Sequence, residues 1–211
     1  MPEDLAPAPA SPFPLLGEPL AIDLVNTVAA VGPGGAVVDL IATPEGLRAW
    51  LEAQVERLDA DRDATDALLA ELPSVLALRE ALRALIRAAM RSEEPEGAAL
   101  ALVNATSASA PLYSVLEWPD GGPPRAHTHH RSDGPAAPVL ATIARSGIDL
   151  LAGDQRHLLR ACEGPGCVLL FLATNPRRHW CSTAVCGNRV RVARHYRRRH
   201  GPDVAPPNAT R

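Results

Sequence analysis

Apolar residues recur at helical spacing in the first third of the chain. In the segment Leu20-Ala-Ile-Asp-Leu-Val-Asn-Thr27, positions 20, 21, 24 and 25 form one helical face, and Asp23 and Asn26 lie off that face. Thr43-Pro44-Glu45 predicts the start of a second helix, because threonine can cap it, proline suits its first turn and glutamate favours the positive end of its dipole. That helix is expected to run through Trp50 to about residue 58.

Further helices are predicted in the middle of the chain. From Pro73 to about residue 91, leucine and isoleucine residues form an apolar stripe, and Arg79, Glu80, Arg83 and Arg87 are expected on the outward face. Residues 98–104 and 138–152 are also expected to be helical. Between them, two extended segments flank the turn Asp120-Gly-Gly-Pro-Pro124, which predicts a β-hairpin.

These elements predict a mostly α chain, formally α+β because of the small β-hairpin. Residues 1–14 are rich in proline and alanine and are expected to be a flexible N-terminus. A helical N-terminal domain is expected over residues 15–154, a small C-terminal module over residues 155–201, and a disordered tail over residues 202–211.

Charge is distributed very unevenly between these two parts, although the net charge is only −3. Residues 1–154 contain ten arginines and 22 acidic residues, whereas residues 155–200 contain ten arginines and a single acid, Glu163. The chain has no lysine, which we attribute to the base composition of its gene rather than to function. An acidic body joined to a basic end indicates a polyanionic partner for that end.

The sequence also carries expectations about cellular location. The first 20 residues lack the basic and apolar segments of a secretory leader, and the longest apolar run, residues 168–173, is too short to span a bilayer. We therefore expect a cytoplasmic protein that does not enter the membrane. In a reducing compartment, closely spaced cysteines favour a metal over disulfides.

All four cysteines, Cys162, Cys167, Cys181 and Cys186, follow the spacing C-x4-C-x13-C-x4-C. Two close pairs separated by a longer loop can supply the four thiolates of a tetrahedral, structural zinc site. Gly164-Pro165-Gly166 allows a tight turn between the first two ligands, and residues 168–172 read as a strand. Buried thiols and two disulfides are the alternatives. Replacing Cys181 is expected to release zinc and unfold the C-terminal module alone.

Histidines supply two further metal candidates. His179 could replace Cys181 as a ligand, but we interpret it as a surface or phosphate-contacting residue. His127, His129 and His130 form a cluster without cysteine or carboxylate partners at ligand spacing, which is more typical of a solvated strand or turn than of a metal site.

After Cys186 the chain predicts a basic helix that ends at Gly201-Pro202. Asn188 can cap this helix, and Val192 and Tyr196 are spaced to pack back on the module. A row of guanidinium groups can bind phosphates and reach guanine edges. The candidate nucleic-acid-binding residues are Arg177, Arg178, Arg189, Arg191, Arg194, Arg197 and Arg198.

Several motifs resemble a known family. The segment from Cys162 to Arg199, with Trp180-Cys-Ser182 and Cys186-Gly-Asn-Arg189, resembles the CGNR zinc finger. The N-terminal part, with residues 20–27, Asp39-Leu40, Leu47-x-x-Trp50-Leu51 and residues 78–83, resembles the ABATE domain. The resemblance implies a bacterial stress-induced transcription regulator with a DNA-binding module that holds zinc.

The sequence supports more than one function. We expect a DNA-binding transcription regulator, and the alternative is an RNA-binding or protein-interaction module with a structural zinc. A homodimer is possible, and Asp23, Asn26 and Trp50 are the residues of the body that could bind a ligand, although hydrogen bonds that fix the helix packing explain the first two better. No catalytic motif is present, so we do not expect an enzyme.

Overall fold

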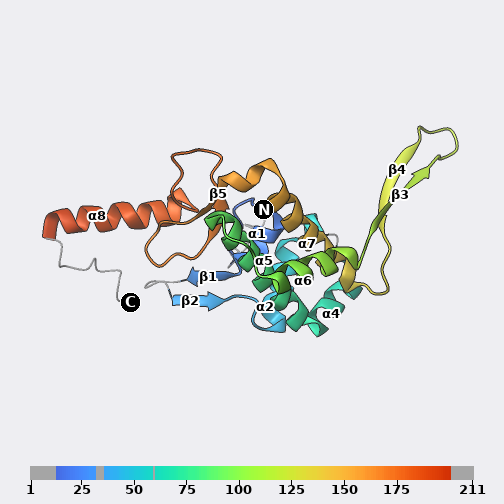
Figure 1. Ribbon diagram of the computed structural model, residues 1–211, viewed down its shortest axis with the longest axis horizontal. Helices are drawn as coiled ribbons and strands as arrows, with labels where there is room; N and C mark the ends of the chain where they lie inside the picture. Colours follow the sequence, from blue (N-terminus) through green and yellow to red (C-terminus); the bar gives the residue numbers. More distant parts are fainter. Residues whose placement is uncertain (1–12, 32–35, 59, 201–211) are drawn as a thin grey trace, which may run out of the picture.

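The computed structural model describes residues 13–31, 36–58 and 60–200, except for the side chains of residues 31, 184, 185, 193–197 and 200. Within these ranges, seven helices form the body in the order α1 (Leu20–Val25), α2 (Pro44–Ala53), α3 (Val55–Leu58), α4 (Arg62–Ala70), α5 (Leu72–Arg91), α6 (Gly97–Ala108) and α7 (Ala136–Ala152). Figure 1 shows the labelled helices of the body packed into one cluster, with α1 beside α5 and α7. The fold is mostly α, as the sequence predicted. None of the described helices is long and apolar enough to cross a membrane.

Helix α1 is buried on all sides because it packs against both α5 and α7. Gly147 of α7 makes this close approach possible, because a Cβ there would collide with Leu82 of α5 and lie 3.5 Å from the Cβ of Ala21. The predicted start of α2 is confirmed: the Thr43 hydroxyl accepts a hydrogen bond from the Gly46 amide at 3.2 Å.

Helix α5 differs from the prediction in which side chains it buries. Arg79 and Arg83 are only 4% and 9% exposed, so the expectation that they face outward is wrong. Arg79 donates two hydrogen bonds to the Asp39 carboxylate, at 2.6 and 2.7 Å, and Arg83 donates one to the Val25 carbonyl at 2.8 Å. A long side chain can enter the core when its charge meets such partners, and periodicity alone does not reveal them.

Three antiparallel pairs of short strands complete the described chain. They are β1 (Val28–Val31) with β2 (Ala36–Asp39), β3 (Leu112–Glu117) with β4 (Arg125–His130), and β5 (Leu159–Ala161) with β6 (Leu170–Leu172). The β3–β4 hairpin and the β6 strand were predicted, whereas the β1–β2 pair was not. Residues 32–35, between β1 and β2 in the sequence, lie outside the described residues.

The structure describes only part of the two predicted terminal segments. Residues 1–12 and the predicted tail over residues 202–211 lie outside the described residues. Phe13, in contrast, is 6% exposed and belongs to the main core, so the expected flexible segment does not extend to residue 14. A 3-10 helix, η1 (Asp154–Leu158), a π-helical turn, η2 (Thr183–Gly187), and helix α8 (Asn188–His200) lie beyond the body.

Candidate zinc centre and basic helix

The β5–β6 hairpin carries the zinc-binding region on the helical body. Leu159, Leu170 and Leu172 join the main core, whereas Leu169 and Phe171 join a second core that contains three of the cysteines. This alternation follows from the two-residue repeat of a strand, which turns successive side chains to opposite faces. The second core also takes Ala29, Leu16 and Leu40 from the N-terminal part, so the two parts share it.

A tight turn brings the first two cysteines together. Gly166 has φ of +72°, a conformation that glycine adopts without strain, and the Cys167 amide donates to the Gly164 carbonyl at 2.9 Å. At Gly164 a Cβ would lie 3.0 Å from the Cβ of Cys186 and 3.1 Å from its sulfur. A side chain at residue 164 would therefore crowd the sulfur cluster, which explains the glycine.

The four cysteine sulfurs all lie within 4.8 Å of one another. Cys181 Sγ lies 3.9 Å from Cys167 Sγ and 3.6 Å from Cys186 Sγ. Four thiolates at about 2.3 Å from a zinc ion form a tetrahedron whose edges measure about 3.8 Å. The donor set therefore fits zinc, which is the cofactor of this site. Four protein ligands leave no open position, so the ion would supply a structural cross-link.

Hydrogen bonds and burial determine which of the four sulfurs is most readily deprotonated. Cys162 Sγ accepts hydrogen bonds from the amides of Gly164 at 3.4 Å and Cys181 at 3.3 Å. Without a cation, the hydrogen bond from Cys181 lowers the pKa of Cys167 to about 5. Burial raises the pKa of Cys186 to about 12. A bound zinc would replace these protons, because thiolates are its ligands.

The histidine candidates do not join this cluster. His179 is exposed and its Nδ1 lies 2.9 Å from a carboxylate oxygen of Glu163. His127 lies on the β3–β4 hairpin and contacts Glu117 at 3.0 Å. Over the part of the chain that the structure describes, the four cysteines are the only group of three or more metal-ligating side chains whose donor atoms converge.

Arg178 is a structural residue rather than an exposed cation, which departs from the prediction. Its guanidinium donates to the carbonyl oxygens of Leu172 (3.1 Å), Trp180 (3.2 Å) and Cys181 (2.7 Å). It also stacks on the Phe171 ring, 4.4 Å from the ring centroid. Arg178 therefore ties the strand after Cys167 to the backbone of the third ligand, and its guanidinium nitrogens are engaged by these acceptors.

Asn26 joins the helical body to the zinc module. Its side-chain amide donates to the Leu170 carbonyl and accepts from the Leu170 amide, both at 2.9 Å. Asn26 thus takes the place that a further strand would have beside β6. Glu18, which the sequence analysis did not single out, accepts a hydrogen bond from the Leu172 amide at 2.9 Å and lies 3.4 Å from Arg178. These contacts span 144 and 154 residues of sequence, so no local pattern marks them.

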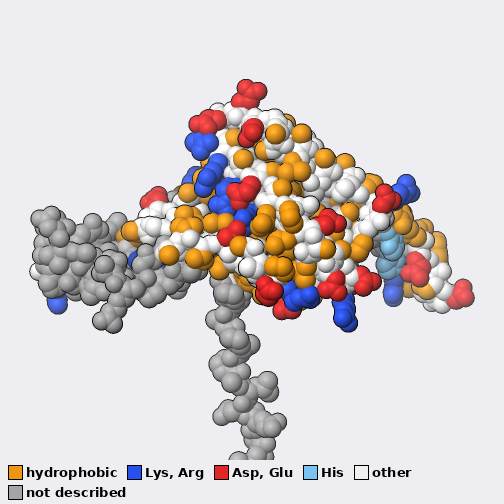
Figure 2. Space-filling model, turned by 90° about the horizontal axis from the view of Figure 1, so that it is seen from below, with side chains coloured by type: hydrophobic (Ala, Val, Ile, Leu, Met, Phe, Trp, Pro, Cys, Tyr) orange, Lys and Arg blue, Asp and Glu red, His pale blue; other side chains and the backbone are white. Residues whose placement is uncertain are grey.

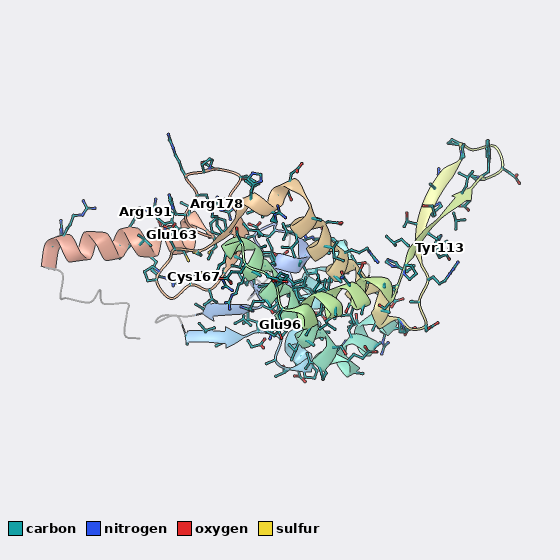
Figure 3. All side chains as sticks on the ribbon, in the orientation of Figure 1. Glu96, Tyr113, Glu163, Cys167, Arg178 and Arg191 are labelled. Atoms are coloured by element: carbon teal, nitrogen blue, oxygen red, sulfur yellow. The ribbon has the colours of Figure 1, made fainter. Side chains whose placement is uncertain are left out.

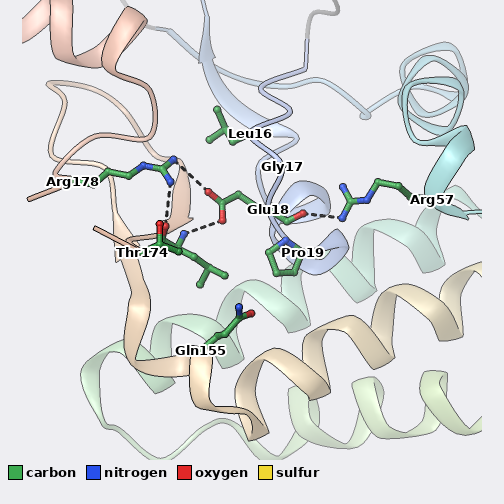
Figure 4. A pocket seen from close by; sticks show the side chains of 9 residues that line it. Leu16, Gly17, Glu18, Pro19, Arg57, Gln155, Thr174 and Arg178 are labelled. Carbon is green, nitrogen blue, oxygen red and sulfur yellow. Dashed lines mark hydrogen bonds and ion pairs between the residues drawn. The ribbon is translucent and has the colours of Figure 1, made fainter. Parts of the chain in front are cut away.

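An open cleft of about 490 Å³ lies along this seam (Figure 4). Arg178 and Arg57 lie on opposite sides of Glu18, which is 5% exposed and whose pKa is raised by burial. Arg57 donates to the Glu18 carbonyl at 2.8 Å and to the Asp23 carboxylate at 2.5 Å. Both guanidinium groups are therefore held by protein acceptors, and the cleft has the chemistry of a structural seam.

Asp23 and Trp50, the remaining candidates for a ligand site, are core residues. Asp23 is 2% exposed, and burial raises its pKa although Gln54 and Arg57 donate hydrogen bonds to it. Trp50 is fully buried, and its indole nitrogen has no hydrogen-bond partner among the described residues. Neither side chain reaches a surface where a ligand could bind.

Helix α8 continues directly from the fourth zinc ligand. Cys186 belongs to the π-helical turn η2, so the helical chain begins before Asn188. Figure 1 shows α8 extending away from the body, and Figure 3 places Arg191 at the same end of the molecule as Cys167. Val192 is 57% exposed and does not pack back on the module as predicted, because the helix points outward.

The arginines of α8 occupy two kinds of position. Arg189 donates to the Pro165 carbonyl at 3.3 Å, and Arg191 donates to Asn188 Oδ1 at 2.5 Å, so both hold the first turns. Arg198 and Arg199 are exposed near the far end, and Arg177 is exposed on the loop before the third cysteine. The side chains of the predicted residues Arg194, Tyr196 and Arg197 lie outside the described residues.

Two protein-family models match the chain one after the other. Residues 18–154 match the ABATE model, which is described as a "putative stress-induced transcription regulator". Residues 158–199 match the CGNR zinc finger. No curated protein matches the chain. The first match covers more than half of the chain, and the second encloses all four cysteines.

Proposed function

Because the chain belongs to the ABATE family and carries a CGNR zinc finger over residues 158–199, we propose that it is a DNA-binding transcription regulator. In this proposal the zinc centre holds α8 in a fixed direction, and α8 lies against duplex DNA. The helical body would carry the regulatory input.

The observation that carries the proposal is the placement of α8. The helix contains six arginines and no acidic residue, and it starts next to Cys186 at the zinc centre. Its 13 residues extend over about 20 Å, and a helix of this kind fits the major groove, which is about 12 Å wide. The body behind it is strongly acidic, so the molecule would meet a polyanion with its basic end.

The role of the arginines differs along the helix. Arg189 and Arg191 have backbone or side-chain partners within the module, so they support the orientation of α8. Arg198 and Arg199 are exposed and are the described side chains of α8 best placed to contact phosphates. Phosphate contacts of this kind supply affinity and position more than sequence specificity.

The test measures binding of the zinc-loaded chain to labelled duplex DNA by fluorescence anisotropy across a salt series. We expect Arg198→Ala with Arg199→Ala to weaken binding and to reduce the slope of log K against log salt by about 1–2. The control is Arg62→Ala with Arg87→Ala, which removes the same charge from exposed sites on the body. Equal loss in both variants, or no binding by the unmodified chain, would refute the proposal.

The same titration with RNA separates the alternative function. Tighter binding to RNA than to duplex DNA would favour an RNA-binding module. Binding to neither, with zinc in place, would favour a module that recognises a protein. We further propose that the chain acts in the cytoplasm and that it does not catalyse a reaction. Both proposals rest on the sequence motifs alone.

A further inference from the structure

The β3–β4 hairpin projects from the helical body as an isolated two-stranded ribbon (Figure 1). We call residues 111–132 the arm. Every residue of β3 is exposed, so neither face of this strand is covered. Five large apolar side chains of the arm are 41–70% exposed, namely Leu112, Tyr113, Val115, Leu116 and Trp118. Figure 2 shows apolar side chains and histidines gathered at this end of the molecule.

The base of the arm is fixed to the body. Arg145 of α7 donates to the Ala110 carbonyl at 3.0 Å and lies 3.3 Å from His130 Nδ1. The Arg131 amide donates to the Pro111 carbonyl at 2.9 Å. The arm is thus held outward, yet a two-stranded ribbon is only marginally stable in water without further strands or a covering layer. Exposed apolar side chains on such a ribbon indicate an interaction surface.

The two outer edges of the arm differ in charge. Strand β4 carries Arg125 and three histidines, and Arg131 follows it directly. Strand β3 carries one charged residue, Glu117, at its end. Two β4 edges brought together antiparallel would bring Arg125 of one copy close to Arg131 of the other, and like charges destabilise a sheet, whereas two β3 edges meet mainly through apolar side chains.

We propose that the arm is a dimerisation element, in which β3 pairs antiparallel with β3 of a second copy of the chain. In such a pair, a two-fold axis perpendicular to the sheet passes between the two copies of Ser114. Residues that lie opposite each other then point to the same face of the sheet, as the two-residue repeat of a strand requires. Leu112 then lies opposite Leu116 of the second copy, and Tyr113 opposite Val115 of the second copy. The result is a four-stranded antiparallel sheet, which reaches the size at which sheets are stable. This inference stands whether or not α8 binds DNA.

The test measures the mass of the zinc-loaded full chain by sedimentation equilibrium over a concentration series. We expect a dimer. Leu112→Glu with Leu116→Glu places carboxylates opposite carboxylates and raises the dimer dissociation constant by roughly 100-fold. The matched control is Leu100→Glu with Leu102→Glu, which changes two exposed leucines of α6, 46% and 37% exposed, and leaves the dimer intact.

A charge-swap experiment tests the register and guards against misfolding. Leu112→Lys with Leu116→Lys should also be monomeric, but an equimolar mixture of the Glu and Lys variants should form a heterodimer, because each carboxylate then meets an ammonium group. A monomeric unmodified chain would overturn the proposal, as would a dimer that the Glu variant leaves intact or a mixture that stays monomeric. If the unmodified chain is monomeric and the Glu variant no longer binds DNA, the arm would instead be a surface that contacts nucleic acid.

Discussion

Asn26 provides the sharpest test of the idea that the helical body and the zinc module are one cooperative unit. Asn26→Ala removes both hydrogen bonds to Leu170 and leaves a buried amide and a buried carbonyl without partners. Each unsatisfied group costs about 1–3 kcal/mol, so we expect the variant to lose about 2–6 kcal/mol of unfolding free energy. The stability of a domain is only about 5–15 kcal/mol, which makes this a large fraction.

The assay follows urea unfolding by two signals from the same samples. Far-ultraviolet circular dichroism reports the helices of the body, and a chromogenic chelator reports zinc release. With a slope of about 2–3 kcal/mol per M urea, both midpoints should fall together by about 1–2 M. They should move together because β6 follows Cys167 closely and Leu170 and Leu172 of β6 lie in the main core.

The control for this experiment is Asn104→Ala, which removes an exposed asparagine from α6. We expect the unfolding free energy of this control, from either signal, to change by no more than about 0.5 kcal/mol. A loss below that limit in Asn26→Ala would show that the two hydrogen bonds contribute little. A fall in zinc retention alone, with the helical transition unchanged, would refute the claim of a single cooperative unit.

Three further predictions follow from the packing and the buried charges. Asp39→Asn should cost about 3 kcal/mol at pH 7, because it leaves the two terminal nitrogens of the buried Arg79 guanidinium without a carboxylate and only Glu80 on its Nε. Burial alone would raise the pKa of Asp39, but hydrogen bonds from Arg79 outweigh it and hold the pKa below the ordinary 3.8. This contribution is therefore complete above pH 3.8 and is lost as the pH falls towards the folded pKa, so in urea titrations the difference between the two proteins should narrow once the pH falls below 3.8. Cys181→Ser should release zinc and also lower the thermal midpoint of the body, since the cysteines share a core with Leu16, Ala29 and Leu40. If the body of the variant melts at the same temperature as in the unmodified chain, the C-terminal module unfolds alone, as the sequence predicted. Gly147→Ala should cost about 1–3 kcal/mol in urea unfolding because its Cβ would collide with Leu82, and an unchanged midpoint would show that α5 and α7 can separate without loss.

Much of the architecture was predictable because it depends on local patterns. Helix α2 follows from its Thr43 cap and Pro44, and the β3–β4 hairpin from two extended segments around a Gly- and Pro-rich turn. The zinc centre was predictable for a similar reason. Cysteine is the preferred structural ligand of zinc, and two close pairs constrain the geometry so strongly that residue type and spacing suffice.

Other features depend on partners far away in the sequence. Arginine is usually a surface residue, but Arg79 and Arg83 enter the core because Asp39 and the Val25 carbonyl accept their hydrogen bonds there. Arg178 was predicted to bind nucleic acid because it belongs to a basic segment, yet three backbone carbonyls hold its guanidinium inside the module. A charge count cannot distinguish an arginine that faces solvent from one that is enclosed by acceptors.

The sequence by itself determined the helical class, the four zinc ligands and the basic character of the last helix, since each rests on composition or on spacing over a few residues. The tertiary structure decided how these parts are joined. It placed Asn26 and Glu18 against β6, across about 150 residues of chain, and it left the arm uncovered. The physical reason is that periodicity encodes which face of an element is apolar, whereas the identity of the surface that covers this face emerges only when distant segments pack together.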